Sequence, residues 1–275
     1  MPRPVYSSKG SVVMEKDVCH IQSFAVIGLP VTRHGVSLIR HVVEAGLRPK
    51  FGLIIAQRDD QLERSSGLWS VPEWWEKAAE GWSETEPASE SGAIGEDSVE
   101  ALYRVHRVPY VFVPDLNGQV ACEIISRGAV DAILLAEGPI LREPILRASR
   151  CGVVNVHAAP LPEYRGNHAT RWALYHDEPL CVSAHIVDKG IDTGPILARQ
   201  HLPVMRTDTL VDVDERGFKV CGELAAEVFA HAIRTGVPIQ PQRPWQGRTF
   251  KGQMPREFIE ELERRLRDQE YSHYE

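Results

Sequence analysis

The feature that most constrains the fold of this chain is a series of short apolar segments, separated mostly by stretches of helical length. Continuously apolar segments are typical of strands buried on both faces, and their alternation with helices predicts a doubly wound, mostly parallel α/β sheet. The predicted strands are FAVIGL (24–29), FGLIIAQ (51–57), VPYVFVP (108–114), DAILLAEG (131–138), GVVNVHA (152–158), VSAHIVD (182–188) and PILARQHLPV (195–204). In such a sheet, functional groups lie at the carboxyl ends of the strands.

The same pattern divides the chain into three parts. We expect an N-terminal arm at residues 1–23, an α/β domain at residues 24–236 and a short C-terminal extension at residues 237–275. The extension ends in a charged amphipathic stretch, in which Phe258, Leu262 and Leu266 form an apolar stripe. We expect this helix to pack against the main domain, and the alternative is a contact with a partner, such as a second copy in a homodimer.

An insertion at residues 68–99 interrupts the alternation and contains four of the six tryptophans, followed by an acidic, Ser-rich stretch. This composition predicts a helical insertion packed by its tryptophans and a surface loop. The alternatives are an aromatic lid, a stacking platform or a dimer contact. Trp245 is interpreted as a packed anchor of the extension, with stacking on a nucleotide base as the alternative.

Composition narrows the classes of partner. The net charge of −7 argues against nucleic acid, because binding of phosphates requires a basic face. We find no apolar run of the roughly 18 residues that a membrane span needs, and the first residues do not resemble a signal peptide. The five cysteines are widely spaced and include no CxxC pair, which argues against zinc and indicates reduced thiols. We therefore expect a cytoplasmic protein.

Two polar residues lie at the end of one predicted core strand, in NVHAAPLPEYRG (155–166). Because residues i and i+2 of a strand face the same way, Asn155 and His157 share one face, and Val154 and Val156 share the other. Polar groups at the end of a buried strand need hydrogen-bond partners or a function. A rigid, proline-containing loop follows them directly.

A third candidate is Asp192, which lies between two glycines in IVDKGIDTGPIL (186–197). On its own this residue is interpreted as a turn aspartate that caps its own backbone. Beside an imidazole, however, a carboxylate orients the ring and raises its pKa. An amide close to both can donate to an oxygen that becomes negative. The set suits attack of an amine on a carbonyl carbon without a covalent enzyme intermediate.

These residues resemble a known family. The order Asn-x-His, a proline-containing loop ending in Arg-Gly, and Asp-x-Gly about 35 residues later is similar to the folate-dependent formyltransferases. That family includes glycinamide ribonucleotide, methionyl-tRNA and amino-sugar formyltransferases. LLAEGPILREPIL resembles its folate-binding loop, and RWALYHDEP and VPYVFVPDLNG resemble flanking segments. The resemblance covers roughly residues 24–236, and it implies a formyltransferase-type Rossmann-like core.

The resemblance implies transfer of a formyl group from N10-formyltetrahydrofolate to a primary amine. Asn155 would hold the formyl oxygen, His157 would move a proton between the amine and the leaving nitrogen, and Asp192 would orient His157. The pterin would lie against backbone of two segments, whose candidate residues are Leu135, Ala136, Glu137, Gly138, Pro139, Ile140, Leu141, Asp188, Gly190 and Ile191. The family needs no metal, and the spacing of His168 and His176 matches no metal motif.

The identity of the acceptor amine is the part of the predicted reaction that the sequence constrains least. GLPVTRHG (28–35) replaces the phosphate-binding loop of the glycinamide ribonucleotide enzymes, which argues against that substrate. Initiator tRNA is disfavoured by the acidic charge and by the roughly 40 residues after Gly236, fewer than an added domain needs. A nucleotide-linked amino sugar is therefore the preferred acceptor. Candidate residues for it are Tyr164, Arg165, Asn167 and Arg171, although both arginines could instead form salt bridges.

Other functions remain open at this stage. The same three residues would serve a formyltetrahydrofolate hydrolase, in which water replaces the amine. They would also serve a formyltransferase for another small amine or an aminoacyl acceptor. Finally, the scaffold could be a non-catalytic folate-binding module.

Overall fold

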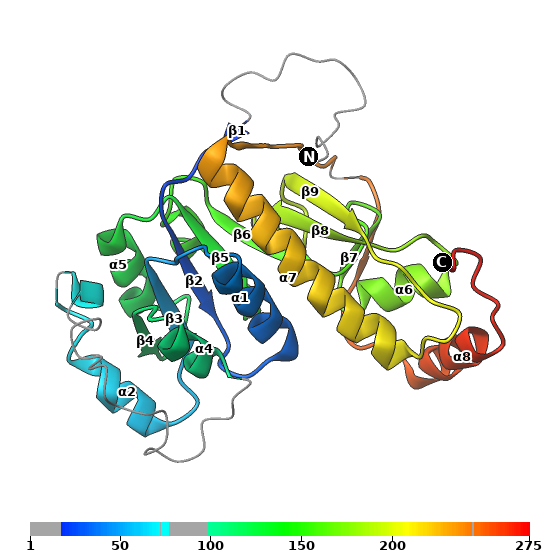
Figure 1. Ribbon diagram of the computed structural model, residues 1–275, viewed down its shortest axis with the longest axis horizontal. Helices are drawn as coiled ribbons and strands as arrows, with labels where there is room; N and C mark the ends of the chain where they lie inside the picture. The colour runs from blue at the N-terminus through cyan, green and yellow to red at the C-terminus, as the bar shows by residue number, and fades with distance from the viewer. Residues whose placement is uncertain (1–17, 72, 77–97, 244) are drawn as a thin grey trace.

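The computed structural model describes residues 18–71, 73–76, 98–243 and 245–275 (Figure 1). The strands are β1 (Val18–Cys19), β2 (Phe24–Gly28), β3 (Phe51–Ile55), β4 (Tyr110–Val113), β5 (Ala132–Ala136), β6 (Val153–His157), β7 (Tyr164–Gly166), β8 (Cys181–Ile186), β9 (Ile196–His201), β10 (Val237–Pro238) and β11 (Arg248–Phe250). The helices are α1 (Arg33–Glu44), α2 (Asp59–Ser66), α4 (Val99–Val105), α5 (Gln119–Gly128), α6 (Ala169–Tyr175), α7 (Leu210–Arg234) and α8 (Arg256–Arg267), with a short 3-10 turn η2 (Ile145–Arg147).

The predicted strands form one seven-stranded sheet in the order β4-β3-β2-β5-β6-β8-β9. From β4 to β6 neighbouring strands are parallel, whereas β8 is antiparallel to both β6 and β9. The mostly parallel, doubly wound α/β fold is therefore confirmed. Because β8 runs antiparallel to β6, the residues that lie opposite each other on these two strands cannot be deduced from the order of the strands alone.

Helices cover both faces of this sheet. One apolar cluster joins α1, α4 and α7 to the sheet through residues such as Phe24, Val154 and Val156. The other joins α5 to the opposite face through residues such as Ile27 and Val153. In Figure 1, α1 and α7 run side by side over the first face. Burial of apolar side chains on both faces explains why the strands read as continuous apolar runs.

The strand order reverses between β2 and β5. From β2 the chain proceeds through α1 to β3 on one side, whereas β5 and β6 lie on the other. In an open sheet, a crevice forms at the carboxyl ends of the strands at such a reversal. The ends of β2, β5 and β6 therefore define where a site is expected.

The N-terminal arm and the insertion lie partly outside the described residues, at 1–17, 72 and 77–97. Within the described part, β1 pairs with β10 of the extension. Trp74 and Trp75 are buried and pack on Phe51 with ring centroids 5.4 and 5.6 Å away. These two tryptophans thus pack the insertion against the core, and they are not free to form a lid.

The C-terminal extension is built into the α/β domain. Strand β11 pairs in parallel with β7, and Leu262 and Leu266 of α8 are buried in the first apolar cluster. Phe258 packs on Trp172, with centroids 5.2 Å apart, so the predicted contact with the main domain is present. The interpretation of Trp245 as a packed anchor is wrong, because this side chain is 79% exposed at the tip of a turn. No helix of the described ranges is long and apolar enough to cross a membrane.

Candidate active site

Asn155 and His157 lie at the carboxyl end of β6 and open into a cavity of about 800 Å³. Val154 and Val156 are buried against α7 on the opposite face, as the strand period predicts. The cavity lies at the crevice that the strand order defines. Its volume is within the range of pockets that bind cofactors and small substrates, about 300–1,000 Å³.

Asp192 approaches His157 from the loop between β8 and β9. Its Oδ2 lies 3.5 Å from Nε2 of His157 and accepts a hydrogen bond of 2.8 Å from the backbone N–H of Gly166. Asp192 has a φ of 52°, a left-handed conformation that Asp adopts more readily than most residues. The loop is tight, since a Cβ on Gly194 would lie 1.8 Å from the carbonyl oxygen of Ile186.

The surroundings of Asp192 keep it ionised. Burial raises the pKa of this carboxyl, but His157, His185 and the N–H of Gly166 favour the carboxylate and lower the pKa by more, so it lies below its ordinary value. The carboxylate therefore faces His157 with its charge intact at neutral pH. It can orient the ring and stabilise its protonated form.

A second histidine completes this cluster, and the sequence did not single it out. His185 on β8 lies directly opposite Asn155 on β6 because the two strands are antiparallel. It is 1% exposed, and its Nε2 lies 3.3 Å from Nδ2 of Asn155 and 3.5 Å from Oδ1 of Asp192. Burial lowers the pKa of His185 to about 4, so the ring is neutral. The only hint in the sequence was a histidine in the core strand VSAHIVD.

The tautomer of His185 follows from its partners. Nδ1 lies 3.1 Å from the carbonyl oxygen of Ile186, which can only accept, so Nδ1 carries the hydrogen. Nε2 of the neutral ring then accepts a hydrogen bond from the amide of Asn155. This bond fixes the orientation of Asn155 and leaves its second N–H for another acceptor.

The segment predicted to bind folate forms one wall of the cavity. Leu135 of β5 lines it together with five residues after that strand, namely Glu137, Gly138, Pro139, Ile140 and Leu141, and Asp188, Gly190 and Ile191 line it from the loop after β8. Ala136 does not line the cavity, because it is fully buried beneath α1. The Ile140 side chain is 73% exposed at the rim.

Of the four residues predicted for the acceptor, only Asn167 lines this cavity. Arg171 instead forms an ion pair with Asp214 of α7. Arg165 is 2% exposed and donates to Oε1 of Gln242, which in turn donates to the backbone carbonyl of Asp192. Arg165 thus supports the loop that carries Asp192, and it does not reach into the cavity.

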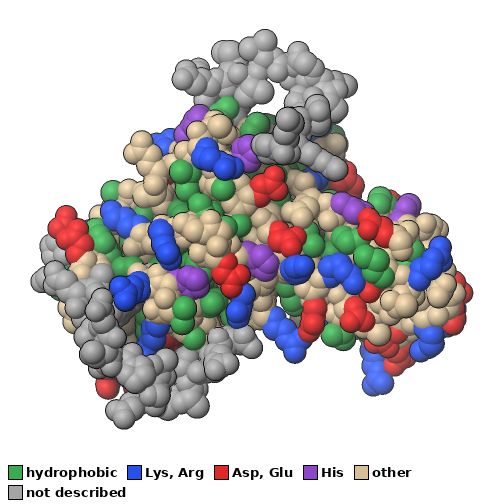
Figure 2. Space-filling model, in the orientation of Figure 1, with side chains coloured by type: hydrophobic (Ala, Val, Ile, Leu, Met, Phe, Trp, Pro, Cys, Tyr) green, Lys and Arg blue, Asp and Glu red, His purple; other side chains and the backbone are tan. Residues whose placement is uncertain are grey.

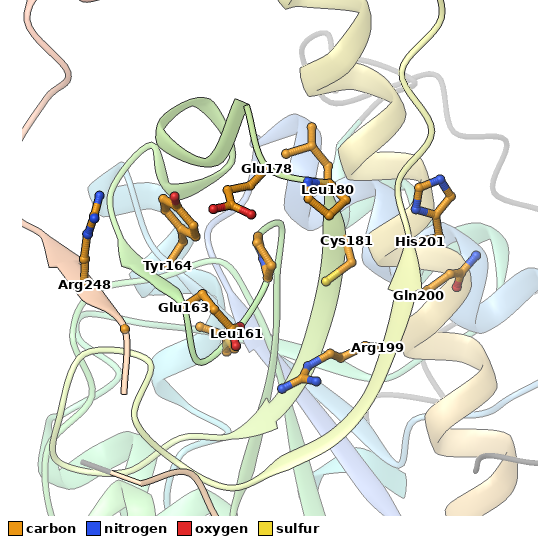
Figure 3. A pocket seen from close by; sticks show the side chains of 13 residues that line it. Leu161, Glu163, Tyr164, Glu178, Leu180, Cys181, Arg199, Gln200, His201 and Arg248 are labelled. Atoms are coloured by element: carbon orange, nitrogen blue, oxygen red, sulfur yellow. The ribbon is translucent and has the colours of Figure 1, made fainter. Parts of the chain in front are cut away.

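Tyr164 lines a different cavity, of about 670 Å³ (Figure 3). Its hydroxyl is 3.1 Å from Nδ1 of His176. Figure 3 shows Arg199 and Arg248 approaching this second cavity from β9 and β11. Tyr164, Arg165 and Arg171 follow β6 closely in the sequence, but they do not line the cavity of Asn155 and His157.

The two histidines considered as metal ligands lie in different surroundings. His168 is at the cavity and bonds to Gln253, whereas His176 stacks on Trp172 with centroids 6.0 Å apart. Among the described residues, no three His, Cys, Asp or Glu side chains converge as a metal site would require.

Comparison with known proteins identifies the segment that holds most of these residues. Residues 117–229 match the family model described as formyl transferase. A methionyl-tRNA formyltransferase of Halorhodospira halophila is 33% identical over 167 residues, which are 57% of this chain and 54% of the relative. The chain thus spans about half the length of the curated relatives it matches. The predicted resemblance to folate-dependent formyltransferases is confirmed.

Solved structures share the fold at low sequence identity. A sugar N-formyltransferase from Shewanella sp. superposes with a TM-score of 0.55 at 15% identity, over 89% of this chain and 87% of that one. An N-formyltransferase from Helicobacter canadensis, solved with folinic acid and dTDP-3-aminofucose, gives 0.54 at 15% identity, over 92% and 84%. These likenesses establish the formyltransferase type of α/β fold.

Proposed function

We propose that this chain, whose residues 117–229 match the formyl transferase family, transfers a formyl group from N10-formyltetrahydrofolate to a primary amine. The observation that carries the proposal is the convergence of Asn155, His157 and Asp192 on one cavity. Three polar groups from two separate segments meet where an α/β fold holds its ligands. The ionised carboxylate of Asp192 and the free N–H of Asn155 have the chemical form that formyl transfer requires.

The roles follow from the hydrogen bonds. The second N–H of Asn155 donates to the formyl oxygen and stabilises the negative charge that develops there. Nε2 of His157 is buried and makes no hydrogen bond within the described residues, so it is available to a ligand. His157 exchanges a proton with the substrates, and the Asp192 carboxylate, 3.5 Å away, orients it and stabilises its charged form.

The cavity also fits the donor. The wall at Leu135 to Leu141 presents backbone groups and the apolar side chains of Leu135 and Ile140, which suits a flat pterin ring with polar edges. Lys251 lines the same cavity and provides positive charge for carboxylates at the far end of a folate, whereas Lys189, which also lines it, is paired with Glu143 at 3.1 Å. The H. canadensis enzyme, solved with folinic acid, has a related fold.

We propose a nucleotide-linked amino sugar as the acceptor, in preference to tRNA. The Shewanella protein is a sugar N-formyltransferase and the H. canadensis enzyme was solved with dTDP-3-aminofucose, whereas the sequence relatives are methionyl-tRNA formyltransferases. In Figure 2, Lys and Arg side chains on the face shown are interspersed with Asp and Glu. A tRNA partner requires a continuous basic surface, and the net charge of −7 argues against one. Asn167 is our candidate for contact with the acceptor.

We further propose that residues 24–236 are the catalytic unit and that the reaction takes place in the cytoplasm. The five cysteines form no disulfide, as expected for a reducing compartment. The arm at 1–23 and the extension at 237–275 would support this unit, since β1 pairs with β10 and β11 pairs with β7.

The decisive experiment follows release of tetrahydrofolate from N10-formyltetrahydrofolate by absorbance. The panel of acceptors contains nucleotide-linked amino sugars, glycinamide ribonucleotide, methionyl-tRNA and free amines. Release that depends on one class of amine supports the transferase and identifies the acceptor. An equal rate without any amine would make the protein a hydrolase, and binding of folinic acid without turnover would make it a binding module.

A further inference from the structure

A further imidazole, beside those of His157 and His168, lines the cavity and has no role in the mechanism above. His34 lies in the first turn of α1, and its ring lines the same cavity as Asn155 and His157. Its Nε2 is buried and makes no hydrogen bond within the described residues. The cavity therefore holds two buried imidazole nitrogens that make no hydrogen bond within the described residues, Nε2 of His34 and Nε2 of His157, and only the second faces a carboxylate, that of Asp192 at 3.5 Å.

The neighbours of His34 fix its protonation state. The backbone of Val156 lies beside the ring and favours its protonation, which is the effect of a carbonyl oxygen. Because Nε2 makes no hydrogen bond within the described residues, we assign the ring hydrogen to Nδ1, the nitrogen left to face this carbonyl. Burial and the nearby His157 lower the pKa of His34 to about 4, and the N-terminus of α1 also disfavours a positive charge. Nε2 is therefore a neutral acceptor, with its lone pair free.

The fold holds this ring firmly. His34 stacks on Phe218 of α7, with centroids 5.4 Å apart and 24° between the planes. Thr32 caps α1 by accepting from the N–H of Gly35, and Gly35 lets the helix approach the carbonyl of Ala136. These contacts fix the first turn of α1 over the ends of β5 and β6. The ring is positioned as a group in a preorganised site would be.

Formyl transfer moves protons at two different nitrogens, that of the attacking amine and the leaving nitrogen. A single imidazole must change position to serve both. When the amine attacks the formyl carbon, a C–N bond forms and the amine nitrogen must lose a proton. Before the bond from carbon to the leaving nitrogen breaks, that nitrogen must gain a proton. For a neutral amine the two transfers cancel, so a site with one acceptor and one donor can perform both at once.

We propose that His34 Nε2 accepts the proton of the attacking amine while His157, held by Asp192, donates the proton to the leaving nitrogen. This proposal rests on the proposed formyl transfer and divides its proton transfers between two rings. After turnover His34 is protonated and His157 is neutral, and passage of one proton from His34 to His157, directly or through solvent, restores the starting state. Such a pair would favour neutral amines as acceptors.

The test uses variants that distinguish the contributions of Nδ1 and Nε2 of His34. His34→Asn keeps a donor near the position of Nδ1, for the Val156 carbonyl, and lacks Nε2. His34→Gln places a polar atom near Nε2. His34→Phe keeps the ring that stacks on Phe218 without either nitrogen. For each variant we would measure kcat and KM for the amine, binding of folinic acid, and the melting temperature.

If the proposal is correct, His34→Asn and His34→Phe lower kcat about 100-fold, near the lower end of the effect of a general base. The kcat of His34→Gln falls less than that of the other two variants only if the amide oxygen of Gln accepts the proton of the amine. The affinity for folinic acid stays within about twofold of the wild-type value in all three variants. If a folded His34→Asn protein turns over at the wild-type rate, the proposed role of His34 is wrong and the proposed formyl transfer is unaffected. A wild-type protein that releases no tetrahydrofolate with any amine would overturn the formyl transfer itself, and with it this role.

Discussion

The amide of Asn155 donates a hydrogen bond to the buried, neutral ring of His185, at 3.3 Å across the antiparallel pair β6 and β8. This contact turns Asn155 so that its other N–H faces the cavity. Removal of a donor to a developing oxyanion typically lowers kcat by about 10² to 10³. We expect this loss for Asn155→Ala, in the assay of tetrahydrofolate release.

His185 should act only through Asn155. His185→Leu removes the acceptor, and we expect it to lower kcat about 10-fold or more in the wild-type background. In the Asn155→Ala background the same change should have little further effect, so the double-mutant cycle should give a coupling of about 0.5–3 kcal/mol. Additive effects would contradict the positioning role of His185.

The charge of Asp192 should matter more than its shape. Asp192→Asn retains an oxygen for the N–H of Gly166 but removes the carboxylate that faces His157. We expect kcat to fall by about 10² to 10⁴ with a small change in stability. Asp60→Asn, which affects only an exposed pair with Arg58, is the control and should retain full activity. A fully active Asp192→Asn enzyme would exclude an electrostatic role.

Gly35 should be intolerant of any side chain. A Cβ at this position would lie 2.7 Å from the carbonyl oxygen of Ala136, so the first turn of α1 would have to move. We expect Gly35→Ala to lower the free energy of unfolding by about 1–3 kcal/mol, measured in urea. Gly67→Ala is the matched control, because a Cβ there meets no atom within 4 Å. Equal stability of the two variants would contradict the close packing of α1.

Part of this site follows from local rules of sequence. The period of two along β6 places Asn155 and His157 on one face, and the strand and helix pattern places them at a functional edge. The approach of Asp192 to His157 required the family resemblance, since a 35-residue separation does not define a contact. Asn167 is at the cavity as expected.

The remainder depends on tertiary contacts that the sequence pattern does not encode. His185 meets Asn155 through the register of antiparallel strands, and His34 reaches the cavity because α1 packs closely on Ala136. Tyr164 and Arg165 follow β6 in the sequence but lie outside the cavity of Asn155 and His157, because they belong to β7, which pairs with β11. Exposure of Trp245 at a turn likewise depends on how the extension folds back.

Cys151 should be unusually reactive. A hydrogen bond from Cys19 and the nearby guanidinium of Arg150 lower the pKa of the Cys151 thiol to about 7, although burial opposes them. We expect alkylation of Cys151 by iodoacetamide, followed by mass spectrometry, to rise with a midpoint near pH 7. Cys19→Ala should move this midpoint upward. Cys122 is the internal control, because burial raises its thiol pKa, and an equal midpoint for both cysteines would contradict this assignment.

Two buried neutral histidines should make the protein sensitive to mild acid. The pKa values of His34 and His185 are lowered to about 4 in the folded chain, against about 6.5 when unfolded. Between these values the unfolded chain binds protons that the folded chain does not, so stability falls as pH decreases from 6.5 to 4. The full effect is on the order of 3 kcal/mol for each ring. The lowered pKa of Asp192 acts in the same direction, but chiefly below about pH 5, because its stabilisation is lost as the pH falls through the unfolded value of 3.8.

Urea midpoints at pH 7, 6, 5 and 4.5 would measure this dependence. We expect the midpoint of the wild type to fall steadily over that range, and the double variant His34→Gln with His185→Gln to show a flatter profile, because it lacks both groups. His201→Gln is the control, since this ring is exposed and paired with Glu275, and its profile should follow the wild type. A wild-type midpoint that is constant from pH 7 to 4.5 would show that neither ring is held neutral in the folded protein.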